Sequence, residues 1–267
     1  MQRLCADTPR ILPRVSASTP TLYVFAISHY CEKARWALDF LGIEHQLRFV
    51  APGEHGQIAK QLGAPRSSVP FLQLGDNVIQ GSADIMSWAD STAAATGHRL
   101  TPDTDIELAL EIEQRIDSVA GVHVRRFYYS EAMVEHAATI RPIFIADLPL
   151  MQKLKTSLGW SKIRKIMITR MDLGQEQGLE SQRIVEGELD WLDDLLSDGR
   201  EYLVGERFSR ADIAVASLLS PLALPSEHPT YSGLTHPPKL AATIVDWGER
   251  ASLQWVRDIY RKHRWPQ

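Results

Sequence analysis

The stretch that decides the fold is TLYVFAISHYCEKARWAL, residues 21–38. It opens with an apolar run, which is typical of a short buried strand. From Ala34 onward, apolar residues recur three and four positions apart and so share one face of a helix, which Gly42 ends. A strand therefore passes into a helix through the turn SHYC, residues 28–31, and this turn stands at the amino-terminal end of the predicted helix.

The segments after this helix alternate in type. Residues 43–50 again have the alternation of a strand, and residues 51–65 read as a loop with a short helix. VPFLQL and NVIQ are two strand-like runs separated by Gly-Asp, a pair typical of a hairpin turn, and a helix over residues 83–94 follows. The order βαβαββα predicts an α/β domain over residues 20–98.

Beyond residue 101 the strand patterns stop and only helical patterns remain. One long helix is predicted from Leu108 through HVRRFYYSEAM at residues 123–133, and another over residues 184–196. FSRADIA begins a third, because its serine and aspartate have the spacing of a capping box. A last helix is predicted over residues 241–262, so the second domain is expected to be all-helical.

The domain boundary is expected at residues 98–104, where a proline and turn formers gather, and the helical domain is expected over residues 105–267. Residues 1–19 are expected to be a flexible tail, because Pro9 and Pro13 would break a targeting helix. A short organellar presequence is the alternative for this tail.

Composition excludes several classes of protein. Apolar residues make up 44% of the chain and charged residues 23%, which is typical of a soluble globular protein, and the net charge of -4 argues against a general nucleic-acid binder. The only two cysteines, Cys5 and Cys31, provide neither a disulfide framework nor a zinc spacing, so a cytoplasmic location and no metal are expected. The most apolar stretch, Ile213–Leu224, is about half as long as a membrane span, and no membrane partner is expected.

Three positions in the first domain are suited to a ligand with negative charge. Ser28 stands at a helix start, where free amides and the helix dipole favour a thiolate and the hydroxyl either donates to it or caps the helix. Pro70 opens a strand, which suggests a turn or a cis bond that leaves the amide and carbonyl of Val69 free. Ser82 begins another helix and marks a second anion-binding terminus.

Four motifs in this order resemble the cytosolic glutathione transferase superfamily. SHYC resembles the Ser-x-x-Cys turn of its theta and delta classes, VPFL its Val-Pro segment before the third strand, and GSADI its Glu-Ser-x-x-Ile segment. FSRADIA resembles the amino-terminal box of a buried helix in its second domain. The resemblance implies a thioredoxin-like first domain with a mixed four-stranded sheet, followed by an all-α helical bundle.

The resemblance also implies roles for the residues of the first domain. Ser28 takes the place of the hydroxyl that activates the glutathione sulfur. Val69, held by Pro70, takes the place whose backbone pairs with the cysteinyl part of glutathione. Ser82 takes the place that holds the γ-glutamyl carboxylate.

Two positions depart from the pattern of the superfamily. Gly81 stands where an acid or glutamine is usual, so one contact to the γ-glutamyl group comes only from backbone or is missing. Ser68 stands where a basic residue is common, which leaves the glycine carboxylate of glutathione without its usual partner. Arg66 is the first candidate to replace it, because it is nearest in sequence to Val69. Lys60 and His55 are the other candidates.

Cys31 and His29, the two other residues of the turn that could take part in chemistry, can also have purely structural roles. Cys31 is a possible thiol for mixed disulfides, but without a cysteine at position 28 dithiol chemistry is excluded, and simple packing is the expected role. His29 occupies a place that is often proline in related turns, where it either tunes the thiolate or is exposed.

The stretch HVRRFYYSEAM lies on the helix that faces the cleft in this superfamily. Phe127, Tyr128 and Tyr129 offer apolar surface to an electrophile, and Arg125 or Arg126 offers a charge to its leaving group. Helical geometry lets only some of these side chains face one cleft, so Tyr128 or Tyr129 is expected there.

Residues 148–171 contain no acidic residue. Solvated helix faces are the expected explanation, and a patch for an anionic partner is the alternative. The basic residues of this stretch are Lys153, Lys155, Lys162, Arg164, Lys165 and Arg170.

The resemblance implies a glutathione transferase of the detoxification type, a homodimer that presents the thiolate of its co-substrate glutathione to a small hydrophobic electrophile. Two alternatives stay open. One is a glutathione-binding or ligand-binding protein with little turnover on the same fold, which the departures at Gly81 and Ser68 favour. The other is a thiol transferase that acts through Cys31.

Overall fold

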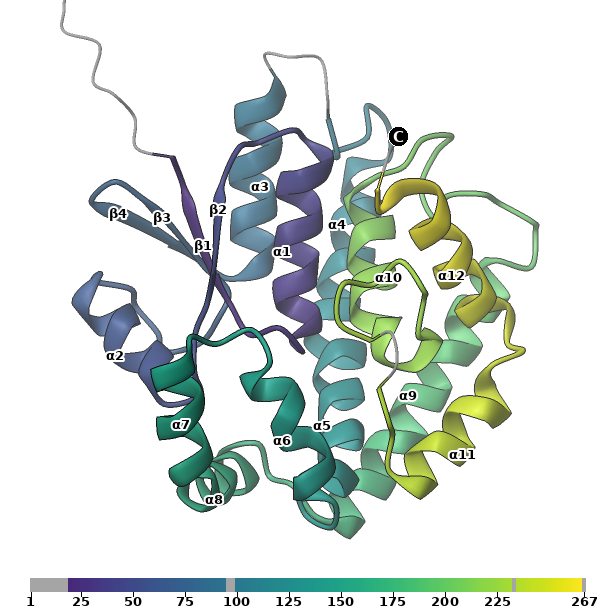
Figure 1. Cartoon of the computed structure of the whole chain (residues 1–267). Coiled ribbons are helices and arrows are strands. Elements are labelled where there is room, and N and C mark those ends of the chain that lie inside the picture. The colour runs from purple at the N-terminus through teal and green to yellow at the C-terminus, as the bar shows by residue number, and fades with distance from the viewer. Residues whose placement is uncertain (1–18, 95–98, 232–233, 266–267) are drawn as a thin grey trace, which may run out of the picture.

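The computed structural model describes residues 19–94, 99–231 and 234–265 (Figure 1). A small sheet domain lies against a larger helical domain, and α1 lies between the sheet and the helices (Figure 1). The expectation of a flexible tail concerns residues that, but for residue 19, lie outside the described ranges. The domain limits drawn from the sequence stay a prediction.

The first domain has the predicted order βαβαββα, and the thioredoxin-like fold class is confirmed. The strand order is β2-β1-β3-β4, in which β1 pairs in parallel with β2 and antiparallel with β3, and β3 pairs antiparallel with β4, so the sheet is mixed as expected. Its elements are β1 (Thr21–Val24), α1 (His29–Phe40), β2 (Gln46–Phe49), α2 (Glu54–Gln61), β3 (Phe71–Leu74), β4 (Asn77–Gln80) and α3 (Ser82–Ala93).

The two faces of the sheet belong to separate apolar clusters, because alternate side chains of a strand point to opposite faces. Leu22, Val24 and Leu72 are buried in the main core, which also holds the apolar faces of α1 and α3. Tyr23 and Phe71 point the other way, toward α2, and their rings stack with centroids 4.6 Å apart. The sheet is thus covered on both faces.

The second domain is helical in its described residues, as predicted. The predicted long first helix of this domain runs without a break from α4 to α5, and its middle turn, η2, is π-helical. Three helices between residues 137 and 170 were not predicted individually. The elements are α4 (Ile106–Arg115), η2 (Ile116–Ala120), α5 (Gly121–Ala132), α6 (Ala137–Ile145), α7 (Leu150–Leu158), α8 (Trp160–Arg170), α9 (Gln175–Leu195), α10 (Arg210–Ala223), α11 (Pro238–Trp247) and α12 (Ala251–His263).

The single last helix predicted over residues 241–262 is wrong. The chain forms α11 and α12, and it breaks between Trp247 and Ala251. Asp193 of α9 accepts a hydrogen bond from the Ser252 amide (2.7 Å) and forms an ion pair with Arg250, so a distant carboxylate caps the start of α12. The sequence period alone carries no sign of this contact.

The capping box of α10 is confirmed. The amide and the hydroxyl of Ser209 both donate to the carboxylate of Asp212, at 2.7 and 2.8 Å. Every residue of α10 is buried, so this helix forms the centre of the second domain. It packs against α1, and the two domains share one apolar core there.

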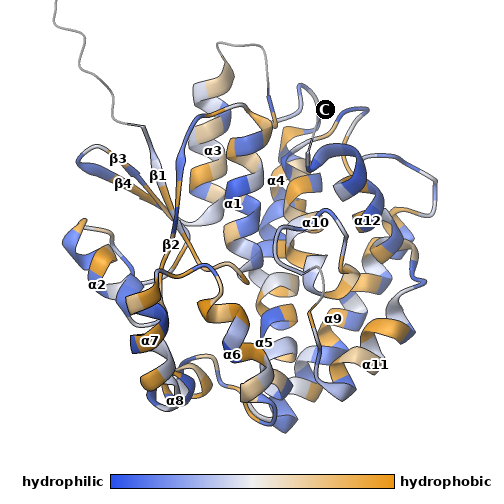
Figure 2. Ribbon diagram, in the orientation of Figure 1, coloured by the Kyte–Doolittle hydropathy of each residue, from blue (hydrophilic) through white to orange (hydrophobic). Residues whose placement is uncertain are grey.

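Charged residues of α1 lie inside this shared core. Figure 2 shows hydrophilic segments on α1 in the middle of the molecule. The Lys33 side chain has no exposed surface, and its ammonium lies 2.8 Å from a carboxylate oxygen of Glu113 and 2.6 Å from one of Asp117. Arg210 of α10 pairs with the second oxygen of Glu113 at 2.5 Å. The first domain is therefore bound to the second through a buried ion network.

A second buried pair lies on the preceding residue of α1. Glu32 accepts a hydrogen bond from the Arg264 guanidinium at 2.5 Å, and neither side chain is more than 4% exposed. Arg264 also lies 3.1 Å from a carboxylate oxygen of Asp39. Together these pairs hold α1 along its length.

None of the helices in the described ranges is long and apolar enough to cross a membrane.

Replacing Lys33 by methionine should lower the free energy of unfolding by about 3 kcal/mol, because it leaves the buried carboxylate of Glu113 and the partly buried one of Asp117 without their shared cation. Urea unfolding followed by tryptophan fluorescence and circular dichroism measures this loss. Lys239→Met is the matched control, since the pair between Lys239 and Glu135 is exposed and should contribute less than about 1 kcal/mol. Equal stabilities of the two variants would contradict the role given to the buried network.

Candidate functional site

Three candidate ligand-binding positions come together at one end of the sheet. Phe71 of β3 pairs with both Tyr23 of β1 and Gln80 of β4, so the end of β1, the start of β3 and the end of β4 lie side by side. Ser28 follows β1, Val69 precedes β3, and Ser82 follows β4. The register of the sheet thus brings these three positions to one edge.

Ser28 is the N-cap of α1 and is half-buried. Its hydroxyl oxygen accepts a hydrogen bond from the Cys31 amide at 3.3 Å, so the capping role is present. The hydroxyl hydrogen is not used by this bond. A serine can accept from the helix and donate to a ligand at the same time, since a hydroxyl offers one donor and two acceptor positions. The two roles weighed for Ser28 are therefore compatible.

The peptide bond between Val69 and Pro70 is cis. Val69 is half-buried, and no described residue makes a hydrogen bond to its amide or carbonyl. The Pro70 carbonyl accepts from the Gly81 amide at 3.1 Å, which ties the start of β3 to the start of α3. The Val69 backbone is thus available to pair with an extended ligand.

The start of α3 is open to a ligand. Gly81 is its N-cap, with a φ of 109° that glycine adopts readily, and no side chain caps the helix. Ser82 is 5% exposed, and no described residue bonds its hydroxyl. The first amides and the positive end of the helix dipole therefore point to a site where an anion is favoured.

Gln80 is a structural residue of the site that the sequence analysis missed. Its side-chain amide donates to the carbonyls of Arg66 and Ser68, at 2.6 and 2.7 Å, and its side-chain oxygen accepts from the Arg66 amide at 2.7 Å. Gln80 is buried at the end of β4 and so fixes the loop that leads to Val69. A polar residue at an inward position of a strand is the signal that could have identified it.

The Arg66 guanidinium lies beside the start of α3. It donates to the Gln80 carbonyl at 3.3 Å, and a Cβ atom at Gly81 would lie 3.4 Å from it and 3.7 Å from the Asp84 carboxylate. A cation and an anion thus flank Gly81. Asp84, in the first turn of α3, was not among the residues expected in the site.

Cys31 is buried, with 2% of its surface exposed. Burial raises the pKa of its thiol to about 12. A thiol of this kind stays protonated at neutral pH and is a poor nucleophile. Among the described residues, no group of His, Cys, Asp and Glu side chains is arranged to hold a metal ion.

His29 is buried, so the expectation that it is exposed is wrong. Its Nε2 atom donates to the Gly121 carbonyl at 3.0 Å, which joins the first turn of α1 to the first turn of α5. Burial, and then the charge of Arg125, lowers the pKa of His29 to about 3, so the imidazole is neutral. A Cβ at Gly121 would lie only 2.7 Å from the Tyr30 hydroxyl, so the helices approach closely where glycine allows it.

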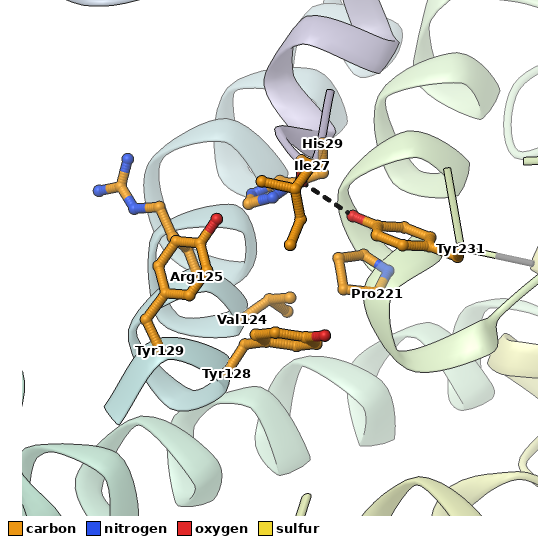
Figure 3. A pocket seen from close by; sticks show the side chains of 8 residues that line it. All are labelled: Ile27, His29, Val124, Arg125, Tyr128, Tyr129, Pro221 and Tyr231. Carbon is orange, nitrogen blue, oxygen red and sulfur yellow. Dashed lines mark hydrogen bonds between the residues drawn. The ribbon is translucent and has the colours of Figure 1, made fainter. Parts of the chain in front are cut away.

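Tyr128, Tyr129 and Arg125, three of the candidates for contact with an electrophile, line one pocket next to Ser28, and the candidates Phe127 and Arg126 do not (Figure 3). Two of its wall residues, Ile27 and His29, flank Ser28 in the chain. The pocket encloses about 10 Å³, room for about one water molecule. Its lining residues are Ile27, His29, Val124, Arg125, Tyr128, Tyr129, Pro221 and Tyr231.

Two of the tyrosines of this pocket, Tyr128 and Tyr231, form hydrogen bonds across it or to its surroundings. The Tyr128 hydroxyl lies 3.1 Å from Nδ1 of His236, and burial raises its pKa. Tyr231, which the sequence analysis missed, donates to the Ile27 carbonyl at 3.2 Å from the opposite wall (Figure 3). Its neighbour Thr230 donates to the Ala26 carbonyl at 2.8 Å, so the second domain holds the loop before Ser28.

The other side of the site is covered by aromatic residues. Phe25, directly after β1, has ring contacts with His55 of α2 and Phe144 of α6, with centroid distances of 4.8 and 6.4 Å. Burial lowers the pKa of His55, which makes this side chain a weak partner for a carboxylate. Lys60 is exposed on the last turn of α2.

Two protein-family models match the chain, and they agree with this geometry. The model described as the N-terminal domain of glutathione S-transferase matches residues 22–97, and the model of the C-terminal domain matches residues 143–227. Together they cover more than half of the sequence. Comparison with curated proteins found no match.

Solved structures of similar fold span almost the whole chain. The β-etherase LigF from Sphingobium sp. strain SYK-6 is 21% identical with a TM-score of 0.56, and the alignment covers 90% of this chain and 99% of that one. Glutathione transferase GSTFuA3 from Phanerochaete chrysosporium is 16% identical with a TM-score of 0.63, over 94% and 100% of the two chains. A glutathione S-transferase of Ceriporiopsis subvermispora, solved with glutathione, is 15% identical with a TM-score of 0.60, over 94% and 99%.

The buried neutral His29 predicts a loss of stability in mild acid. Its pKa is near 3 in the folded chain and about 6.5 when unfolded, so below pH 6.5 only the unfolded state gains this proton and unfolding is favoured. Between pH 7.5 and pH 5, His29 should account for about 2 kcal/mol of lost stability. Urea unfolding of wild type and His29→Asn at both pH values measures this, and parallel losses in the two proteins would contradict it.

Proposed function

Because the chain belongs to the cytosolic glutathione transferase superfamily, we propose that it is a glutathione transferase that transfers the glutathione thiolate to a hydrophobic electrophile. The observation that carries this proposal is the meeting of Ser28, the Val69 backbone and the open start of α3 at one sheet edge. A tripeptide with a central thiol can contact all three at the same time.

The γ-glutamyl end of glutathione would bind at the start of α3. This end carries a carboxylate and an ammonium on one carbon atom. The Ser82 hydroxyl, the free amides of α3 and the Arg66 guanidinium suit the carboxylate, and Asp84 suits the ammonium. On this proposal Arg66 serves the γ-glutamyl end, whereas the sequence made it the first candidate for the glycine carboxylate.

The cysteinyl part would lie along Val69. Its backbone amide and carbonyl are available for the pair of hydrogen bonds that an extended peptide makes with a strand edge. Gln80 holds the loop from Arg66 to Ser68 by three hydrogen bonds, so this edge is fixed before the ligand arrives. A preformed edge reduces the entropy cost of binding.

Ser28 would activate the sulfur. Its hydroxyl donates to the bound sulfur, and the amino-terminal end of α1 favours the same negative charge, so the pKa of the glutathione thiol falls from about 8.5 or above toward neutrality. The thiol proton goes to solvent. The thiolate then forms a bond to carbon of the electrophile, whose leaving group departs with its electron pair or whose strained ring opens.

The electrophile would enter from the second domain, between Tyr128, Tyr129 and Arg125. The cavity there is too small for a substrate, so side chains of the second domain have to move on binding. The small cavity, together with Gly81 and Ser68, is the observation that favours the alternative of a glutathione-binding protein with little turnover. The burial of Cys31 speaks against a thiol transferase. A homodimer and a cytoplasmic location stay predictions.

Replacing Ser28 by alanine should raise the pKa of bound glutathione and lower conjugation by roughly ten- to a hundredfold, the worth of one hydrogen bond to a charged group. The ultraviolet band of the thiolate, followed against pH, and turnover with aryl halides, epoxides and disulfides measure both effects. Ser28→Thr keeps the hydroxyl and should keep most of the activity, while Cys31→Ser should lose little. If Ser28→Ala keeps the band and turnover while Cys31→Ser loses activity, the serine mechanism is wrong.

Replacing Arg66 by glutamine tests which end of glutathione this residue serves. We expect affinity to fall roughly tenfold or more, and equally for glutathione and for γ-glutamylcysteine, which lacks the glycine. Ser82→Ala should weaken both ligands in the same way. Ser91→Ala, farther along α3, is the control and should change neither affinity. If calorimetry shows that Arg66→Gln loses affinity for glutathione but not for γ-glutamylcysteine, Arg66 binds the glycine carboxylate instead.

A further inference from the structure

Helix α7 presents its apolar side chains to solvent. Leu150 and Leu158 are 81% and 80% exposed, Met151 is 63% exposed and Leu154 is 55% exposed. At 100° per residue these four side chains fall within one arc of about 100° on the helix. Figure 2 shows hydrophobic segments on α7 at the edge of the molecule.

The opposite face of α7, which points into the protein, is polar. Thr156 is buried there, with 4% of its surface exposed. Gln152 donates to a carboxylate oxygen of Glu54 on α2 at 2.9 Å. The helix is therefore amphipathic, but its apolar face points to solvent, whereas the apolar face of an ordinary surface helix packs on the core.

Lysines border the apolar arc on both sides. Lys153 lies before one edge of the arc and Lys155 beyond the other, while Lys162 and Lys165 are exposed on the adjoining α8. None of these four lysines forms an ion pair within the described part of the chain. Since residues 148–171 contain no acid in a protein of net charge -4, the positive charge is concentrated on α7 and α8.

We propose that α7, with the lysines of α8, docks on the surface of an anionic lipid bilayer. An apolar arc flanked by lysines suits the boundary between headgroups and acyl chains, because the leucines enter the apolar layer while the lysine stems extend back to the headgroups. The surplus of cations matches the negative charge of such a surface. This goes beyond the proposed function, and it replaces the expectations of solvated helix faces and of no membrane partner.

Sedimentation of the full-length protein with lipid vesicles tests the proposal. Vesicles of phosphatidylcholine mixed with phosphatidylglycerol should bind the protein, vesicles of phosphatidylcholine alone should bind it much less, and high salt should release it. The pair Leu154→Ser and Leu158→Ser should weaken binding at least tenfold. The pair Lys155→Gln and Lys162→Gln should weaken it roughly twentyfold, about fivefold per charge.

A matched control removes two exposed apolar side chains elsewhere. Leu179→Ser with Val245→Ser, on α9 and α11, should leave vesicle binding unchanged. Circular dichroism and calorimetry with glutathione verify that each variant is folded.

Four results would overturn the proposal: no binding to any vesicle, equal binding to both lipids, unchanged binding by the α7 variants, or loss of binding by the control. If light scattering gives a lower mass for the Leu154→Ser and Leu158→Ser variant than for the other proteins, a second copy of this chain binds to α7. If the protein binds polyglutamate but no vesicles, the partner is an acidic protein. Either outcome rejects the lipid surface.

Discussion

The ion pair between Lys33 and Glu113 is the contact on which the arrangement of the two domains depends. Neither side chain can leave water without a partner of opposite charge, because the desolvation of one unpaired buried ion exceeds the stability contributed by most other contacts. Lys33 comes from the helix that follows the first strand, and Glu113 comes from the first long helix of the second domain. The buried charge of Lys33 in the first domain is therefore compensated only by carboxylates of the second domain, those of Glu113 and Asp117.

The same helix carries the candidate site at its first turn. α1 is held near its start by the bond from His29 to Gly121, in its middle by Lys33 and Glu32, and farther on by Asp39, which pairs with Arg264. A hydroxyl that has to stabilise a thiolate works best when its position is fixed before the ligand binds. The buried charges that join the domains thus also fix the direction of the helix dipole behind Ser28.

Features that depend on contacts between residues near in sequence could be predicted, and features that depend on contacts between distant residues could not. Alternation and helical period predict the order βαβαββα, and the capping box of α10 is local, so both are readable. The break between α11 and α12 depends on Asp193, and the loop before Val69 depends on Gln80, each a contact between segments distant in sequence. Nearness in sequence to Val69 makes Arg66 a candidate for the glycine carboxylate, whereas in space its guanidinium lies beside Gln80 and Gly81. Distance along the chain is a poor guide wherever a strand pairing intervenes.

The small cavity beside Ser28 has to widen before an electrophile can enter, and the contacts around it determine which wall moves. On the α1 side, movement would separate ion pairs of Lys33 and Glu32 inside the protein, each a loss of several kcal/mol. On the opposite side, a change of rotamer at Tyr128 breaks one hydrogen bond, to His236, a loss of about 1 kcal/mol. The pocket wall formed by the second domain therefore moves more readily than the wall formed by α1. A site of this construction keeps its thiolate position constant and leaves the shape of the electrophile pocket to the tyrosines.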